Sequence, residues 1–332
     1  MKKAASPRGI VVAIVDPTTL LGRDVKAVLS ERGFPASHVL LFQTRSEDGL
    51  LASDDEEAVF VAPLTPDALE SSKIAFLCGQ AADTGRFLSQ RAADGCLAID
   101  LSGVRTGGVF VRPCEGGRAP LPDGDLFLTY EPVAAVLAEA VAIVERLVPV
   151  TGVTAAIDRP ASELGKDALD ELFRQAIALA RFESPPKEIF GAQVAFNAHF
   201  PPDTAGFEAR VAEDVARLLG RPLPVSLLSA RCGVFHGHFL RIELRTDRTP
   251  PPAEEVRVAF RKSAAFEETD PENLAGPVEA AGRDETLLLH VVSSESSVRL
   301  GLAADHLRRT GAIMAVKLAE HAIRERGLLA DA

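Results

Sequence analysis

The sequence lacks several features that mark common functional classes. It has no Trp and one Tyr, so a surface of aromatic side chains that stacks nucleic-acid bases is not expected. Its 36 Lys and Arg residues are outnumbered by 47 Asp and Glu residues, which gives a net charge of -11. A polyanion binder needs clustered cations. These deficits argue against a nucleic-acid partner, but a local Arg could still hold a small anionic ligand.

Long hydrophobic runs and paired cysteines are also absent. The early apolar run at 10–15 is far too short to cross a bilayer, and the first seven residues lack the apolar core of a signal peptide. The four cysteines are scattered and show no metal-ligand spacing: Cys78, Cys96, Cys114 and Cys232. We therefore expect a reduced cytoplasmic protein with no membrane partner and no metal.

The first 130 residues alternate between strand and helix patterns. Apolar runs predict strands at 9–15, 38–43, 58–62, 73–78 and 96–100. Amphipathic patterns predict helices at 21–32 and 82–93. This alternation predicts an α/β fold, a Rossmann-type doubly wound parallel sheet with helices on both faces.

The pattern changes near residue 130, where we place a domain boundary. Helices are expected at 133–146, 162–180, 207–219 and 251–264, and strands at 152–157, 225–230, 239–244 and 287–292. The second part, 131–302, is thus predicted to be an α+β domain with an antiparallel sheet. A last helix at 305–324 could return to either part, and we assign 303–330 to the first domain, 1–130.

The turn after the first strand departs from the dinucleotide-binding pattern. Rossmann domains present backbone N–H groups of a Gly-rich turn to a pyrophosphate. Here Asp16 stands where Gly is expected, Pro17 has no N–H, and of the glycines only Gly22 remains. A carboxylate about 4 Å from a phosphate charge costs roughly 1 kcal/mol in water and about 4 kcal/mol at a dielectric near 20. Weak or no dinucleotide binding is predicted.

If a dinucleotide does bind, two segments supply its candidate contacts. The turn offers Thr18, Thr19, Leu21 and Gly22, of which Gly22 would also let the helix pack closely on the strand. The segment after the second strand offers Thr44, Arg45 and Ser46. A cation with two hydroxyls suits the 2′-phosphate of NADP, although the segment could equally be a solvated loop.

Five segments, in order along nearly the whole chain, resemble the aspartate-semialdehyde dehydrogenase family. They are 12–37, 95–102, 190–197, 231–238 and 307–320. The resemblance implies a Cys thiolate that attacks an acyl phosphate, a His acid/base, an Arg that grips the substrate carboxylate, and hydride transfer with NADP. It also implies a homodimer formed through the sheet of the second domain.

The chain departs from this family where the chemistry is carried. The family has Asn-Cys-Ser/Thr at the start of the helix placed near 133, whereas this chain reads Thr-Tyr-Glu-Pro-Val-Ala-Ala-Val at 129–136. Cysteine is absent between Cys114 and Cys232, so a small register error does not supply the nucleophile. The family's Ser-Gly-Ala-Gly turn is replaced at 158–161 by Asp-Arg-Pro-Ala, whose bulk and charge would fill the nicotinamide space.

Other family positions are retained. By resemblance His238 is a vestigial acid/base and Arg231 the substrate Arg, while Glu208 keeps one acid and Arg210 replaces a Lys. Together they could form a pocket for a carboxylate or phosphate, or His238 could be a packed residue only. A metal pair of His236 and His238 on one strand face has no visible third ligand.

The remaining cysteines are candidates to replace the missing nucleophile. Cys232 should face away from any site that Arg231 faces, because neighbours in a strand point to opposite faces. Cys114 lies in a loop with Arg112 and Arg118, which could lower its pKa.

We interpret the chain as a semialdehyde-dehydrogenase-like pseudoenzyme with a binding or structural role, paired with itself or with an active paralogue. One alternative is an NADP-dependent oxidoreductase of amino-acid biosynthesis that acts on an aldehyde or acyl phosphate with an altered active site. The others are a small-ligand sensor that uses Arg231, Arg210 and His238, and a purely architectural subunit.

Overall fold

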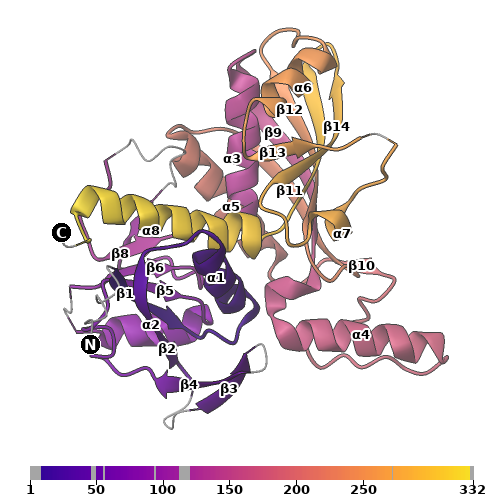
Figure 1. Ribbon diagram of the computed structural model, residues 1–332. Helices are drawn as coiled ribbons and strands as arrows, with labels where there is room; N and C mark the ends of the chain where they lie inside the picture. The colour runs from indigo at the N-terminus through magenta and orange to yellow at the C-terminus, as the bar shows by residue number, and fades with distance from the viewer. Residues whose placement is uncertain are drawn as a thin grey trace. The chain divides into compact units, whose positions relative to one another are not determined.

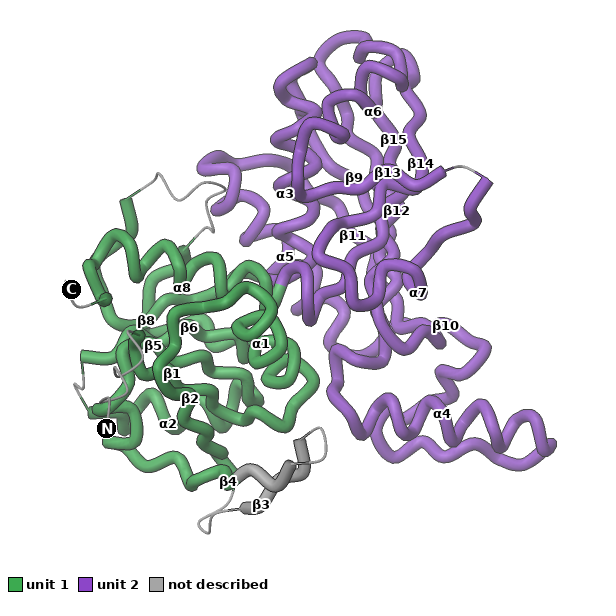
Figure 2. The backbone as a smooth tube through the Cα atoms, viewed as in Figure 1, with its two compact units in different colours: residues 1–130, 311–332 green, residues 131–310 purple. Residues whose placement is uncertain are grey.

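The computed structural model describes residues 9–45, 50–54, 57–92, 95–111, 120–270 and 272–329. The chain divides into two compact units (Figure 2). Unit 1 consists of residues 1–130 and 311–332, and unit 2 of residues 131–310. None of the described helices has the length and apolar character needed to cross a membrane.

Unit 1 is built on an eight-stranded sheet. In spatial order its strands are β3 (Leu50–Asp54), β4 (Glu57–Pro63), β2 (Ala36–Gln43), β1 (Ile10–Val15), β5 (Ile74–Leu77), β6 (Leu97–Asp100), β8 (Leu126–Leu128) and β7 (Val109–Phe110). All neighbouring pairs are parallel except the edge pair of β3 and β4, which is antiparallel. The predicted doubly wound α/β fold is confirmed.

Helices cover both faces of this sheet. They are α1 (Leu20–Glu31), α2 (Ala81–Gln90) and α8 (Ile313–Arg326). Successive side chains of β1 point to opposite faces, so Val12 and Ile14 join the core with α1 and α8, while Ala13 and Val15 pack on the side of Phe87 in α2. Burial on both faces explains why β1 is a continuous apolar run rather than an alternating one.

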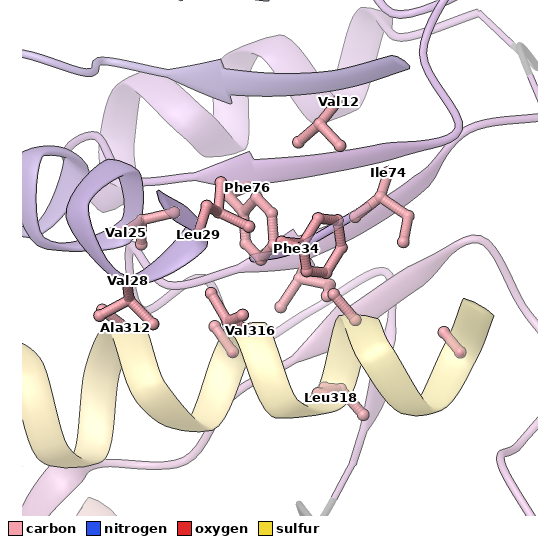
Figure 3. Packing of buried hydrophobic residues seen from close by; sticks show 14 of the residues in the cluster. Val12, Val25, Val28, Leu29, Phe34, Ile74, Phe76, Ala312, Val316 and Leu318 are labelled. Atoms are coloured by element: carbon pink, nitrogen blue, oxygen red, sulfur yellow. The ribbon is translucent and has the colours of Figure 1, made fainter. Parts of the chain in front are cut away.

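The C-terminal helix α8 completes one of these two cores. Its residues Val316 and Leu318 lie in one cluster with Val28 of α1 and Phe76 of β5 (Figure 3). A π-helical turn at Arg308–Ala312 precedes it. The helix predicted for 305–324 therefore starts later, at Ile313, because residues 305–307 leave strand β15 before any helical turn is formed.

Unit 2 contains a seven-stranded mixed sheet. In spatial order its strands are β10 (Ala198–His199), β11 (Val225–Cys232), β9 (Val150–Arg159), β12 (His238–Thr246), β15 (Ser297–Ala304), β14 (Thr286–Ser293) and β13 (Phe266–Glu268). The expected antiparallel pairing holds around β12, β15 and β14. The pairs β11–β9 and β13–β14 are parallel instead. In each of these two pairs the chain between the strands contains a helix, which is how parallel strands are usually connected.

The helices of unit 2 divide into two groups. Those that pack along the sheet are α3 (Pro132–Glu145), α5 (Thr204–Leu219) and α6 (Ala253–Arg261). The short α7 (Pro277–Ala280) contacts β15, and α4 (Lys166–Ala180) projects beyond the β10 end of the sheet (Figure 1). The single helix predicted for 162–180 is broken at Gly165, whose φ of 89° is left-handed, so a separate 3-10 turn η1 (Ala161–Leu164) precedes α4.

Candidate functional site

Three strands of unit 2 bring basic side chains to one end of the mixed sheet. Arg159 is the last residue of β9, and its register partner in β11 is Arg231. His238 is the first residue of the neighbouring strand β12. Their side chains are only 5%, 2% and 4% exposed, so three groups able to carry positive charge are withdrawn from water together. Such burial requires a compensating anion.

Glu163 of η1 supplies that anion. Its Oε2 lies 2.8 Å from Arg159 Nε and 2.9 Å from Arg231 Nη1. Its Oε1 lies 2.6 Å from His238 Nε2. One carboxylate that is 13% exposed thus serves three partners. The structure brings the two predicted residues Arg231 and His238 together, and it adds Arg159 and Glu163, which the sequence analysis did not place in the site.

The backbone that carries Glu163 is fixed on both sides. The N–H of Ala161 donates to the carbonyl of Val234 at 2.9 Å, and the N–H of Ser162 donates to the carbonyl of Phe235 at 3.0 Å. Gly165 then closes the turn with a bond from its N–H to the carbonyl of Ser162. The position of the carboxylate is therefore set by η1 and not by a loose loop.

The electrostatics favour the ionised form of Glu163. Burial alone would raise its pKa, but the hydrogen bond to His238 and the charges of His238, Arg231 and Arg159 hold the pKa of this carboxyl well below its usual range. Arg159 is further held by Asp203, 3.0 Å from its Nη2, and its guanidinium lies 4.0 Å from the ring centroid of Phe207. Glu163 is consequently ionised and paired near neutral pH.

His306 lies against this cluster and was not predicted. Its ring centroid is 4.9 Å from that of His238, in an edge-to-face arrangement. Both of its ring nitrogens are buried, and no hydrogen-bond partner for them is found among the described residues. Burial, with the charge of His238, lowers the pKa of His306 to about 3. The sequence analysis missed it because residues 305–324 were expected to form one helix.

By the resemblance, the family's nucleophile is expected at the start of α3. Glu131 is the residue before the helix, and Pro132 opens it. The Glu131 side chain pairs with Arg210, whose Nε lies 2.7 Å from Glu131 Oε1. Its backbone N–H donates to Asp214 Oδ2 at 2.9 Å. The helix start therefore holds an acid that is already paired, and it has neither a thiol nor a hydroxyl.

Two predicted pocket residues lie away from the Glu163 cluster. Arg210 is committed to Glu131, and Glu208 accepts the backbone N–H of Ser229 at 2.7 Å through its Oε1. Within the described residues, no hydrogen bond or ion pair joins either side chain to Glu163. The side chains of Arg210 and Glu208 are thus bonded to α3 and to β11, and the expected four-residue pocket stays a prediction.

The thiols that the structure describes and the second histidine add no reactive group to the cluster. Burial raises the pKa of Cys232 to about 11, and its Sγ lies 3.5 Å from the carbonyl of Arg159. Cys78 and Cys96 are buried in unit 1, and Cys114 with its two neighbouring arginines lies outside the described residues. His236 precedes β12 in a turn with Gly237 at φ 83°, so the premise that it shares a strand face with His238 is wrong. The described part of the chain holds no cluster suited to a metal ion.

In unit 1 the turn after β1 is closed by its own acid. Asp16 adopts a left-handed φ of 57°, a conformation that favours Gly. Its Oδ1 accepts the backbone N–H of Thr44, and its Oδ2 accepts the Thr44 hydroxyl, both at 2.9 Å. A Cβ on Gly79 would lie 2.1 Å from Asp16 Oδ2, so the carboxylate rests directly on that backbone. The polar groups of Thr44 are therefore already occupied.

The remaining predicted cofactor contacts serve the fold. Thr19 caps α1, and its hydroxyl oxygen accepts the N–H of Gly22 at 3.0 Å. A Cβ on Gly22 would lie 2.5 Å from the carbonyl of Asp16, which explains why Gly is needed there. Leu21 packs against the core, whereas Thr18 is exposed.

The segment after β2 carries the cation expected to meet a 2′-phosphate. Arg45 pairs with Asp83 at the start of α2, with 2.7 Å between its Nε and the carboxylate. Ser46 lies outside the described residues. The described polar groups of Thr44 and Arg45 are thus bound to acids of the chain itself.

Comparisons with known proteins show which sequences and structures this chain resembles. No family model matches the chain. It is 28% identical over 340 residues to a USG-1 protein homolog of Azotobacter vinelandii, covering 95% of this chain and 98% of the relative. It is 24% identical to the aspartate-semialdehyde dehydrogenase of Rickettsia bellii, covering 94% and 97%. Related sequences therefore fall into these two groups.

Solved structures give the same result for the fold. A probable aspartate-semialdehyde dehydrogenase from Pseudomonas aeruginosa matches with a TM-score of 0.86 at 24% identity, covering 96% of this chain and 99% of the other. The chain is thus related over nearly its full length to aspartate-semialdehyde dehydrogenases and USG-1 protein homologs, and it has their two-part fold.

Proposed function

We propose that this protein is an aspartate-semialdehyde-dehydrogenase-like pseudoenzyme with a binding or structural role. The observation that carries the proposal is the start of α3, where an acid paired with Arg210 and a proline stand at the family's nucleophile position. The reaction implied by the resemblance needs a soft nucleophile that also serves as a leaving group. A paired carboxylate meets neither requirement.

The nearest hydroxyls in the sequence do not replace the missing thiol. The hydroxyl of Thr129 donates to the carbonyl of Asp100 at 2.7 Å. The ring of Tyr130 packs on that of Phe110, with 5.2 Å between centroids. An activated hydroxyl needs a base within hydrogen-bond reach. The Thr129 contact provides none, which supports loss of the covalent step.

The retained acid/base is likewise committed. His238 is buried, and its Nε2 contacts Glu163 at 2.6 Å. Its Nε2 is thus already engaged by a carboxylate of the chain itself. This arrangement supports a structural role for His238 in place of proton transfer to a substrate.

The cofactor site supports the same proposal. Relatives of this chain use NADP, but here Asp16 occupies the Gly position of the turn and the polar groups of Thr44, while Asp83 holds Arg45. An NADP phosphate would have to compete with these carboxylates and accept their repulsion, about 1–4 kcal/mol for each charge near 4 Å. We infer that this chain binds NADP weakly or not at all.

Unit 2 also carries a surface suited to a second copy of the chain. Large apolar side chains are exposed around α4, β10 and β11: Phe173, Phe182, Phe196, Phe200 and Leu228. Two of them, Phe182 and Phe196, have left-handed φ values of 59° and 57°, a strain that functional surfaces commonly store. By the resemblance to dimeric relatives, we propose a homodimer through this surface.

Buried polar side chains of α4 hold this surface in shape. Glu171 accepts the backbone N–H groups of Ile189 and Phe190 at 2.6 and 3.1 Å. Gln175 bonds the backbone at Pro186, Ala192, Val194 and Ala195. A preorganised apolar surface loses little entropy on association.

Sedimentation velocity tests the proposed homodimer. The wild-type chain should sediment as a dimer, and F173S/F196S should shift it toward monomer. The control variant F60S, which changes an exposed Phe of unit 1, should remain a dimer.

Two measurements test the pseudoenzyme proposal. Phosphate-dependent reduction of NADP with aspartate semialdehyde should stay at background for this chain and proceed with an active relative assayed in parallel. Titration of intact protein with NADP should show weak or no binding. Turnover well above background would favour the alternative, an NADP-dependent semialdehyde dehydrogenase with an altered active site.

A further inference from the structure

We propose that Arg159, Arg231 and His238 form a carboxylate-binding site whose ligand is the chain's own Glu163. The inference rests on the proposed function, because a site kept for turnover could not be filled permanently by a side chain of the protein. It adds that the site is still a working receptor for carboxylates. A free carboxylate cannot bind to the wild-type protein, because the Glu163 side chain already occupies the site.

The contacts on Glu163 are those that a bound carboxylate would receive. Both oxygens are engaged, Oε2 by Arg159 and Arg231 and Oε1 by His238, all between 2.6 and 2.9 Å. Charge-assisted hydrogen bonds of this length are the strong class. Two guanidinium groups from neighbouring strands converge on one oxygen, and Asp203, which belongs to neither strand, also pairs with Arg159. Strands β9, β11 and β12 therefore supply the binding groups, and η1 supplies the Glu163 carboxylate that they bind.

The receptor also holds donor capacity that Glu163 does not use. Arg159 Nη1 is buried, and it finds no hydrogen-bond partner among the described residues. His199, paired with Arg231 in the β10–β11 register, likewise has a buried Nδ1 with no partner in the described part of the chain. Buried donors normally find partners. One such group on Arg159 and another on the register partner of Arg231 indicate a site with more hydrogen-bonding groups than one carboxylate satisfies.

The receptor frame should persist when the tethered ligand is removed. Glu163 is carried by a turn whose backbone is bonded to residues 234 and 235 through Ala161 and Ser162. None of these bonds involves the Glu163 side chain. The change E163A deletes a CH₂–COO⁻ group, which is the size of acetate. The variant should therefore keep three buried groups around a space that an acetate ion can fill.

The experiment is ligand rescue followed by thermal unfolding of the full chain. Wild type, E163A and E171A are compared in sodium acetate and in sodium chloride of equal ionic strength, with acetamide as the neutral probe of the same shape. E171A is the matched control, because Glu171 is also a buried acid of unit 2 but is held by backbone N–H groups in place of cations.

Acetate should raise the Tm of E163A by roughly 2–4 °C over chloride, the shift expected at about ten times Kd, with no such gain for wild type or E171A. Acetamide should give no gain, because it lacks the charge that the site recognises. Equal Tm values for E163A in acetate and chloride would overturn the proposal, as would an equal gain for E171A.

A second measurement covers failure of E163A to fold in chloride. The variant is then refolded from denaturant in either salt, and acetate should at least double the recovered folded fraction over chloride. E163Q, which keeps the shape of Glu163 but fills the space, should refold equally in both salts. No recovery of E163A in acetate would contradict the inference. These readouts use no enzyme activity, so they are independent of the NADP-reduction assay that tests the proposed function.

Discussion

The two units each place an acid where a ligand would be expected, but the two acids sit in opposite environments. In unit 2 Glu163 is buried against Arg159, Arg231 and His238, and its pKa is held well below the usual range. In unit 1 Asp16 contacts the neutral Thr44, and burial raises its pKa. A depressed carboxyl pKa means that the native state favours the charge, and a raised pKa means that it disfavours the charge.

The backbones differ in the same sense. Asp16 is held in a left-handed conformation that a non-Gly residue adopts at some cost, whereas the turn that carries Glu163 leaves the left-handed region to Gly165. In unit 2 the surrounding charges stabilise the ionised Glu163, whereas in unit 1 burial and a left-handed backbone both disfavour Asp16. Glu163 should therefore occupy the unit 2 site with a large gain in free energy, whereas Asp16 should occupy the unit 1 turn with a small one.

The largest expected effect is the loss of stability when Glu163 is removed. Taking one partner from a buried charge cluster costs about 3–5 kcal/mol, because the remaining charges stay desolvated and lose their shared anion. We expect E163A to lower the free energy of unfolding by that amount in urea titrations at neutral pH. E131A removes a partly exposed acid from Arg210 and should cost less than about 1 kcal/mol. Equal losses of unfolding free energy in E163A and E131A would contradict the view that Glu163 is the more strongly stabilising acid.

The next effect concerns pH. His306 has a folded pKa of about 3, below its unfolded value near 6.5, so the unfolded chain binds its proton first and stability falls as pH drops from 6.5 toward 3. It faces His238, Glu163, Asp305 and His236. Between pH 6.5 and 5, wild type should lose roughly 1–2 kcal/mol more than H306L in urea titrations. Parallel pH profiles would contradict this.

A smaller effect is expected at Asp16. D16G relieves a left-handed non-Gly conformation, worth about 1 kcal/mol, but loses two hydrogen bonds to Thr44 of about 0.5–1.5 kcal/mol each. The free energy of unfolding should therefore change by roughly 1 kcal/mol or less. NADP affinity should rise about tenfold or more as the carboxylate is removed. A large stability loss with no gain in affinity would show that unit 1 is built like unit 2.

The smallest effect belongs to the Arg45–Asp83 pair. Arg45 is 72% exposed, so solvent screens its charge and the pair contributes little. We expect R45A to change the free energy of unfolding by less than about 0.5 kcal/mol. A loss comparable to that of E163A would contradict the view that unit 1 is held only loosely by its acids.

Regular elements of the fold follow from the sequence, and context-dependent ones do not. The apolar run of β1 predicts a strand buried on both faces, and the alternation up to residue 100 predicts the parallel sheet. Strand β15 was missed because Gly and Ala weaken its β-propensity. The structure explains its Gly301, since a Cβ there would lie 3.1 Å from His290 at an irregularity of the β14–β15 register.

The candidate site was predicted in part. Arg231 and His238 are found together, but their partner Glu163 was placed within a helix expected at 162–180. Gly165 was the available signal, since a glycine three residues into a helix favours a break. Arg159 was read as bulk in a cofactor space, because its burial against Phe207 depends on tertiary contacts that no local pattern records.

The central claim is that this chain forms no covalent intermediate. Intact-protein mass spectrometry after incubation with aspartate semialdehyde and NADP, in the absence of phosphate, tests this claim most directly. In a chain with a working thiol, the aldehyde adduct is oxidised by NADP and the acyl group stays on the protein, as an active relative should show in parallel. We predict an unchanged mass for this chain. An increase of one acyl group that appears only when NADP is present would contradict the account.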